Sequence, residues 1–136
     1  MISKYSLGKK DRLKSRKLVD ELFTNGASLT VFPLKVIFAF FPFSAIDDAY
    51  LKVGVTASRR SFKRAVDRNR IKRLIRESYR LQKSDLQALL EKKGLKAHLF
   101  FIYIDKQLPA YPVMFDAMTK CLRLLEKRKS LNESPS

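Results

Sequence analysis

Positive charge is concentrated in two short stretches of this 136-residue chain. Residues 1–17 carry a net charge of +6 and residues 59–83 a net charge of +9, out of a formal total of +16. The remaining 94 residues are almost neutral, with a net charge of +1. A folded domain tolerates such local repulsion mainly when a polyanion neutralises it. We therefore expect a localised surface that binds nucleic acid, with an anionic membrane surface as the second candidate.

The more basic stretch also predicts the longest helix of the chain. Residues 63–82 contain no Gly or Pro, and a period of 3.6 residues divides their side chains between two faces. The apolar face holds Ile71, Leu74, Ile75 and Ser78. The opposite face holds Lys72, Arg73, Arg76, Arg80 and Lys83. Like charges four residues apart destabilise a helix unless an anion neutralises them, so we expect this second face to bind phosphates.

Two shorter patterns predict helices near the ends of the chain. Ser15 suits the N-cap of an amphipathic helix, and Gly26 suits the C′ position after it. Pro112 fits the first turn of a last helix. The side chains expected on the core side of that last helix are Met114, Ala117, Met118, Cys121, Leu122 and Leu125.

Apolar segments between these helices predict strands. Residues 31–43 form one such segment, residues 50–57 form the second or third strand, and residues 97–104 are a continuous apolar run typical of a strand buried on both faces. Together the elements predict an α+β two-layer sandwich with a small mixed sheet, in the order α-β-β-β-α-β-α. We divide the chain into a basic N-terminal arm (residues 1–14), a single RNA-binding sandwich domain (residues 15–126) and a polar, frayed tail (residues 127–136).

The aromatic side chains are divided between core and surface. Strands this apolar need both faces filled, so most of the phenylalanines are expected in the interior. Phe23 and Phe38 fit the interior and the surface equally well. The expected interior aromatics are Phe32, Phe40, Phe41, Phe100 and Phe101.

No protein-borne catalytic or metal site is predicted. The single Cys121 and the single His98 exclude a disulfide framework and a zinc set. His98 has no nucleophile or carboxylate near it in the sequence, so a structural role is expected, and Cys121 is expected in the core. Asp47 and Asp48 are expected to be solvated in a turn. Asp67 leaves two interpretations open, an electrostatic role at a helix N-terminus and contact with a metal.

Neither a membrane span nor a secretory signal is expected. The longest apolar run, residues 31–46, is interrupted by Pro33 and Pro42 and is too short for a spanning helix. The basic residues of the N-terminus are not followed by an apolar stretch. With 46% hydrophobic residues the chain is expected to fold, and we expect a cytoplasmic protein.

The strand, loop and helix of residues 53–77 carry a further signal. Residues 68–70 read Arg-Asn-Arg, residues 65–66 before them read Ala-Val, and residues 53–60 form a Val-Gly-Val strand with a basic exit. With the opening helix of residues 12–26, this arrangement resembles the protein subunit of bacterial ribonuclease P. The resemblance covers about residues 9–125 in the order of that family.

The resemblance implies a fold and a role. Members of the family have a left-handed βαβ crossover, which is an exception to the usual handedness. They bind the catalytic RNA subunit of the enzyme, and a cleft between the first helix and the sheet holds the single-stranded 5′ leader of precursor tRNA. The RNA subunit hydrolyses the leader with Mg²⁺ bound mainly through the RNA, so no organic cofactor, no membrane and no obligate protein partner are implied. The alternative is a ribosomal or general RNA-binding protein without a part in hydrolysis.

The resemblance also assigns roles to residues, none of them catalytic. Val19 stands where many members have an aromatic residue, and Phe38 is the expected substitute for that stacking contact. The loop of residues 61–64 is one residue longer than the commonest form. The residues expected to contact the catalytic RNA are Arg59, Arg60, Lys63, Arg64, Arg68, Asn69, Arg70, Lys72, Arg73, Arg76 and Arg80. The residues expected to line the leader cleft are Arg12, Lys14, Val19, Phe23, Phe38, Thr56 and Ser58.

Overall fold

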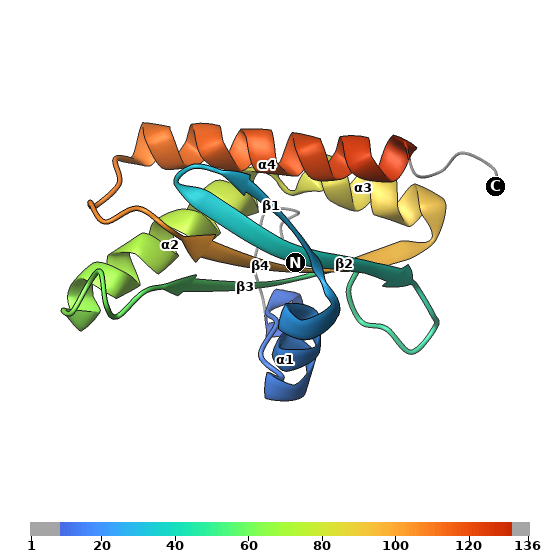
Figure 1. The fold of residues 1–136 in the computed structure, drawn as a ribbon. Coiled ribbons are helices and arrows are strands. Elements are labelled where there is room, and N and C mark those ends of the chain that lie inside the picture. Colours follow the sequence, from blue (N-terminus) through green and yellow to red (C-terminus); the bar gives the residue numbers. More distant parts are fainter. Residues whose placement is uncertain (1–8, 132–136) are drawn as a thin grey trace.

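A computed structural model of the chain describes residues 9–131, and Figure 1 shows its arrangement. One layer of helices covers one face of a four-stranded sheet, and a single helix, α1, crosses the other face. The elements are η1 (Lys9–Asp11), α1 (Arg16–Asn25), β1 (Ala27–Val31), β2 (Leu34–Pro42), β3 (Leu51–Ala57), α2 (Ala65–Gln82), α3 (Ser84–Lys93), β4 (Leu95–Tyr103) and α4 (Tyr111–Leu131). The mixed sheet and the predicted order of elements are confirmed, with α2 followed directly by the additional short helix α3.

The strands lie in the order β1-β2-β4-β3. β2 is antiparallel to both β1 and β4, whereas β3 and β4 are parallel and are connected through α2 and α3. This parallel pair, with α2 and α3 between its strands, is a βαβ crossover as the resemblance implies. The left-handedness of the crossover stays a prediction. The central position of β4 explains why residues 97–103 are apolar apart from His98, because this strand has neighbours on both sides and side chains packed on both faces.

The main core lies between the sheet and the helices α2, α3 and α4. Alternate residues of each strand point into it, such as Val36 and Phe38 of β2 and Leu99 and Phe101 of β4. The helices contribute the predicted faces: Ile71, Ile75 and Ser78 of α2 are fully buried. The predicted core side of α4 is also confirmed, with Met114, Ala117, Met118, Cys121, Leu122 and Leu125 all buried. These amphipathic patterns therefore determine which face of each helix meets the sheet.

The two residues predicted to flank α1, Ser15 and Gly26, lie directly before and after it. The Leu18 N–H donates to the Ser15 side-chain oxygen at 3.3 Å, so Ser15 is the N-cap. Gly26 follows the helix with an ordinary extended backbone (φ −76°) and is needed for another reason: a Cβ atom there would lie 2.5 Å from the Leu22 carbonyl oxygen. Gly26 thus permits the close approach of the helix end to the sheet, because no side chain would fit between them.

Residues 31–43, predicted as strand, contain the last residue of β1 and the whole of β2. The chain turns at Phe32 and Pro33, which are joined by a cis peptide bond, and β1 and β2 pair across this turn as an antiparallel hairpin. Phe32 at the turn is 64% exposed and Phe41 on the α1 side of β2 is 38% exposed, so the prediction that both are interior is wrong. Phe101 is fully buried as predicted.

The ends of the domain differ in detail from the predicted division. Within the predicted basic arm, Leu13 is buried and its N–H donates to the Val53 carbonyl at 2.9 Å, so residues 9–13 pack along β3. α4 continues to Leu131, into the segment predicted as a tail. Residues 1–8 and 132–136 of the predicted arm and tail lie outside the described residues. Among residues 9–131, no helix has the length and hydropathy needed to cross a membrane.

A candidate nucleic-acid interface

The face of the sheet that carries α1 is the first part of the candidate interface. Side chains of β2 and β4 that alternate with the core residues point toward this helix. Leu13, Leu22 and Ile37 form a small buried cluster here. The partly buried side chains packed against that cluster are Leu18, Val19, Ala39, Phe100 and Ile102. α1 lies on this face of the sheet through these contacts, whereas α2, α3 and α4 cover the opposite face.

An aromatic platform lies beside α1. Phe23 packs edge-on against Phe100 of β4, with ring centroids 5.1 Å apart, and is 47% exposed. Gly54 of the neighbouring strand β3 makes this possible: a Cβ atom there would lie 2.5 Å from the Phe100 ring. A glycine in the interior of a strand is a known signal of such a close approach. The platform is thus an exposed aromatic surface built by α1, β4 and β3 together.

Most of the residues predicted to line the leader cleft lie around this platform. Val19 and Phe23 are on the same flank of α1, and Thr56 shares the face because it pairs with Ile102 of β4. Ser58 follows β3, where its side-chain oxygen accepts the Arg60 N–H at 3.1 Å and so shapes the turn toward α2. Arg12 and Lys14 are exposed next to this edge, since Arg12 bridges to Val53 of β3.

Phe38 does not line the cleft, so the prediction for this residue is wrong. It is 2% exposed and lies in the main core, on the face of the sheet opposite α1. The Arg128 guanidinium of α4 lies over its ring, 5.2 Å from the ring centroid. Ile37, one position earlier, faces α1 instead. Successive residues of a strand point to opposite faces, so an error of one residue moves a side chain from the cleft to the core.

Basic side chains of α2 and of the preceding loop form the second part of the interface, which we call the basic ridge. Arg59, Arg60, Lys63 and Arg64 of the loop are exposed. Asn69, Arg70 and Arg73 of α2 are also exposed, whereas Arg68, Lys72, Arg76 and Arg80 are partly buried. The ridge contains only two acidic side chains among residues 59–83, Asp67 and Glu77. Most of its charge is therefore available to an external anion.

Arg68 and Arg80 of the basic ridge make close hydrogen bonds within the protein. Arg68 donates through Nη1 to the carbonyl oxygens of Phe62 and Lys63 at 2.8 and 2.9 Å, so it clamps the loop onto the first turn of α2. Arg80 donates to Glu77 at 2.5 Å, and this pairing raises the pKa of Arg80 and lowers that of Glu77. The exposed centre of the ridge is thus more available to an external anion than these two positions.

The N-terminal segment and the basic ridge meet in space. Arg76 is partly buried on α2, and its pKa is lowered by that burial and by the positive charge of Arg12. Arg12 reaches this position because residues 9–13 pack along β3, next to α2. Complete burial raises the pKa of Tyr79, and the charge of Asp11 in the same segment raises it further. The described part of the N-terminal segment and the basic ridge therefore meet on one surface, and the sequence has no local signal of this meeting.

Burial shifts the pKa values of the single cysteine and the single histidine. Burial raises the pKa of the Cys121 thiol to about 12, so the sulfur is not a nucleophile at neutral pH. Burial lowers the pKa of the His98 imidazole, and the positive charge of Lys96 lowers this pKa further. Among residues 9–131 no three His, Cys, Asp or Glu side chains are grouped to hold a metal ion. Asp67 is half-buried with the Arg64 guanidinium 3.9 Å away.

Comparison with known proteins agrees with this geometry. The family model described as Ribonuclease P matches residues 7–128. The ribonuclease P protein component of Porphyromonas gingivalis is 35% identical over 118 residues, which is 87% of this chain and 85% of that protein. That of Chromohalobacter salexigens is 48% identical over a shorter stretch of 52 residues, 35% of this chain and 41% of that protein.

Solved structures support the fold. The RNase P protein of Staphylococcus aureus superposes with a TM-score of 0.64 at 20% identity, covering 85% of this chain and 94% of that one. The two chains thus share the overall fold. Since the family model spans most of the chain and a relative is 35% identical over 87% of it, this chain belongs to the ribonuclease P protein family.

Proposed function

We propose that this chain is the protein subunit of a ribonuclease P particle that removes 5′ leaders from precursor tRNA. In this proposal the basic ridge binds the catalytic RNA, and the flank of α1 with the aromatic platform holds the single-stranded leader. The RNA carries out hydrolysis with Mg²⁺ that it binds itself, so the protein contributes binding, orientation and neutralisation of phosphate charge. The observation that carries the proposal is the junction of the ridge with the platform at the end of β3.

The basic ridge suits a folded RNA. Arginine presents a planar fork that contacts phosphate oxygens in pairs, and residues spaced three or four apart on a helix follow one line on its surface. Arg70 and Arg73 are exposed and three residues apart on α2. Binding through such contacts releases counterions from the RNA, so the affinity is expected to fall steeply with salt.

The platform suits a single strand rather than a duplex. Phe23 offers nearly half of its surface beside Phe100, and unpaired bases stack on exposed aromatic rings with little dependence on sequence. Thr56 and Ser58 add hydroxyl groups at the end of β3 that leads to the basic ridge. A strand that leaves the platform at this end would pass directly to the cationic surface.

Reconstitution tests this proposal. The protein is combined with a bacterial ribonuclease P RNA at low Mg²⁺, and cleavage of a precursor tRNA is measured with and without a leader long enough to reach the platform. We expect stimulation over the RNA alone and a larger benefit for the longer leader. A protein that binds RNA but leaves cleavage unchanged would instead be a general RNA-binding protein.

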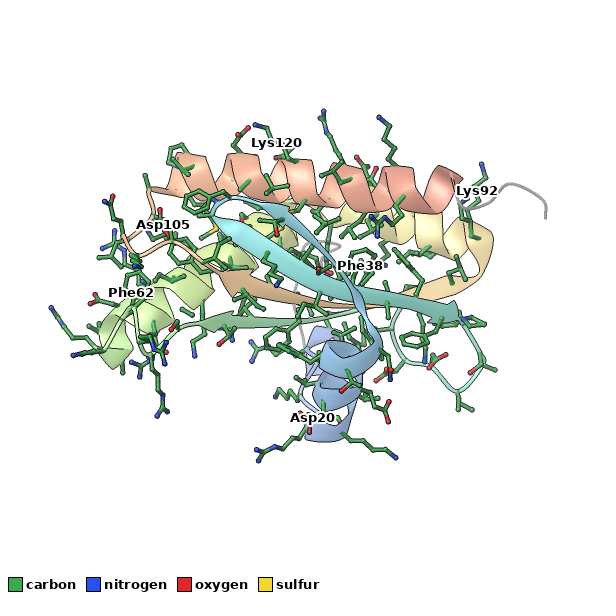
Figure 2. The ribbon with its side chains drawn as sticks, in the orientation of Figure 1. Asp20, Phe38, Phe62, Lys92, Asp105 and Lys120 are labelled. Atoms are coloured by element: carbon green, nitrogen blue, oxygen red, sulfur yellow. The ribbon has the colours of Figure 1, made fainter. Side chains whose placement is uncertain are left out.

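Paired variants separate the two surfaces. Phe23→Ala should remove most of the benefit of a long leader, whereas Phe32→Ala, at the exposed turn between β1 and β2, should not. Arg73→Ala should weaken assembly with the catalytic RNA. Lys120→Ala is the matched control, because Lys120 projects from α4 away from the sheet, as Figure 2 shows.

A further inference from the structure

The two edges of the sheet differ in how they are covered. β3 forms one edge, where residues 9–13 run alongside it and the Leu13 N–H donates to the Val53 carbonyl. β1 forms the other edge, and within the described residues it pairs only with β2. The backbone N–H and C=O groups on its outer side are therefore available to a further strand.

β1 lacks the features that usually keep an edge strand from pairing with another chain. Charged side chains, proline and β-bulges are the common forms of such protection. β1 reads Ala-Ser-Leu-Thr-Val, without a charged residue or a proline, and it pairs with β2 in an unbroken register. Ala27, Ser28 and Thr30 are exposed. β1 is thus an accessible template for an additional strand.

A recess lies next to this strand, between β1 and α4, which run close to each other in Figure 1. Its volume is about 240 Å³, below the range of about 300–1,000 Å³ that is typical of pockets for drug-sized ligands. Leu29 of β1 and Leu124 of α4 form its apolar part, and Leu124 is 44% exposed. We call the outer side of β1 together with this recess the β1 edge. The recess suits one or two side chains of a peptide.

The charged residues that line the recess are both cationic. Lys127 and Arg128 follow Leu124 by three and four residues, so they lie on the same side of α4. The Arg128 guanidinium lies over the ring of Phe38, which pairs with Ala27 of β1. One positive charge is therefore held near the start of β1.

The acidic side chain in this part of α4 belongs to a different surface. Glu126 lines a separate recess together with Arg123 and with Asp85 of α3. A strand added at β1 would therefore meet an apolar contact and two cationic groups on the side of the sheet that carries α4.

Charge complementarity favours an acidic peptide over two other occupants. A second copy of this chain, paired through β1, would bring the same cationic groups to both sides of the contact, in a chain with a formal net charge of +16. An RNA strand has no peptide groups to continue the sheet and no aliphatic side chain to contact the two leucines. An extended acidic segment offers main-chain hydrogen bonds, apolar side chains and carboxylates together.

We propose that the β1 edge docks an extended, acidic segment of a partner protein as an additional strand of the sheet. Alternate residues of that segment face α4. One apolar side chain packs between Leu29 and Leu124, and a carboxylate on the same face of the segment lies against Lys127 or Arg128. β3 and the basic ridge lie at the opposite edge of the sheet, so the docked segment leaves them open and the inference does not depend on the proposed function.

Designed peptides test the β1 edge. The probe is a fluorescently labelled peptide of about nine residues in which threonine alternates with glutamate and leucine, so that the acidic and apolar side chains share one face of the extended chain. The control peptide has the same composition, rearranged so that these side chains fall on both faces. We expect the patterned peptide to bind the full chain about tenfold more tightly. Equal binding of the two peptides, or binding of neither, overturns the proposal.

Amide NMR spectra of the isotope-labelled chain locate the bound peptide. The patterned peptide should shift the signals of residues 27–31 and of α4 near Leu124, whereas shifts confined to residues 59–80 would place it on the basic ridge and refute the docking site. Methylation of alternate backbone nitrogens of the peptide separates strand pairing from side-chain contact. Methyl groups that face β1 should abolish binding, and those in the other register should not. Equal binding of both methylated peptides would contradict strand pairing.

Matched variants identify the side chains that contribute. Leu124→Ala should weaken binding of the patterned peptide about fivefold. Leu81→Ala, which shortens a leucine of similar exposure on α2, should not. Lys127→Ala should weaken binding about threefold, whereas Lys92→Ala removes the same charge from an exposed position on α3 and should have little effect. Equal effects within either pair would overturn the assignment of the recess.

Two further measurements distinguish the other occupants. Raising the concentration of the chain alone should leave the amide signals of residues 27–31 unchanged, and a dimer that shifts them would assign the β1 edge to a second copy. An oligouridine should leave the bound peptide in place. Displacement of the peptide with the same amide shifts would assign the edge to RNA, and either of these results refutes docking of an acidic segment.

Discussion

Replacement of Gly54 by Ala tests how the aromatic platform is built. The new Cβ atom would lie 2.5 and 2.6 Å from two carbons of the Phe100 ring. Ordinary contact between carbon atoms begins near 3.5 Å, so the ring has to move by about 1 Å. Phe100 in turn contacts Phe23 edge-on, so the displacement passes from β3 through β4 to α1.

Two opposing effects set the size of the change in stability. An alanine in a strand interior is more favourable than a glycine by about 0.5–1 kcal/mol. Overpacking of a well-filled site costs about 1–3 kcal/mol. The clash is close enough for the second effect to dominate, so Gly54→Ala should lower the free energy of unfolding by about 1–2 kcal/mol. Urea denaturation followed by far-UV circular dichroism measures this, with a lower midpoint and an unchanged slope expected.

A double variant shows whether Phe100 is the cause. Phe100→Leu removes the ring that the new methyl group meets, so Gly54→Ala should cost much less in that background. The leader-dependent part of precursor tRNA affinity should follow the same pattern, falling in Gly54→Ala. If Gly54→Ala has equal effects on stability with and without Phe100, the glycine serves another purpose and the platform does not depend on it.

Three further predictions follow from single contacts. Arg76→Ala should reduce the slope of log affinity for the catalytic RNA against log salt by about 1, measured by titration at several salt concentrations, and no change would contradict a phosphate contact. Asp47 has a pKa lowered to about 2 by its hydrogen bond with Lys96, so the stability it adds is complete above its ordinary value of 3.8 and is lost as pH falls toward 2. Asp47→Asn should remove that part of the acid dependence of the melting temperature, and equal acid profiles would contradict it. Ser15→Ala should cost about 1 kcal/mol in urea denaturation, because α1 loses its N-cap, whereas an unchanged midpoint would contradict the cap.

The helices could be predicted because their signals are local. The period of Ile71, Ile75 and Ser78 identifies the buried face of α2 without knowledge of what it packs on. The same holds for α4, whose predicted core side is buried throughout. A helix that separates apolar from charged residues this sharply has one way to lie on a sheet, so the pattern predicts both the element and its orientation.

The strand faces could not be predicted in the same way. Residues 31–43 are apolar at nearly every position, so no alternation marks which side chains point to α1. The turn at Pro33 sets the pairing of β1 with β2, and that pairing decides that Ile37 faces α1 while Phe38 enters the core. Because the decision depends on partners in other strands, the prediction for Phe38 failed where the predictions for α2 did not.

Where charges gather on the surface and where they are neutralised likewise depends on the fold, because residues far apart in the sequence meet there. Arg12 and Arg76 meet only because the N-terminal segment runs along β3 beside α2, and Lys96 is neutralised only because the loop after β2 places Asp47 next to it. The result is a cationic surface at one end of β3, next to the aromatic platform beside α1. A single strand of RNA has the same division, with charged phosphates along its backbone and neutral bases projecting from it. In the proposed function, a strand that lays its phosphates on the basic ridge is therefore free to turn its bases toward α1, where the rings of Phe23 and Phe100 lie.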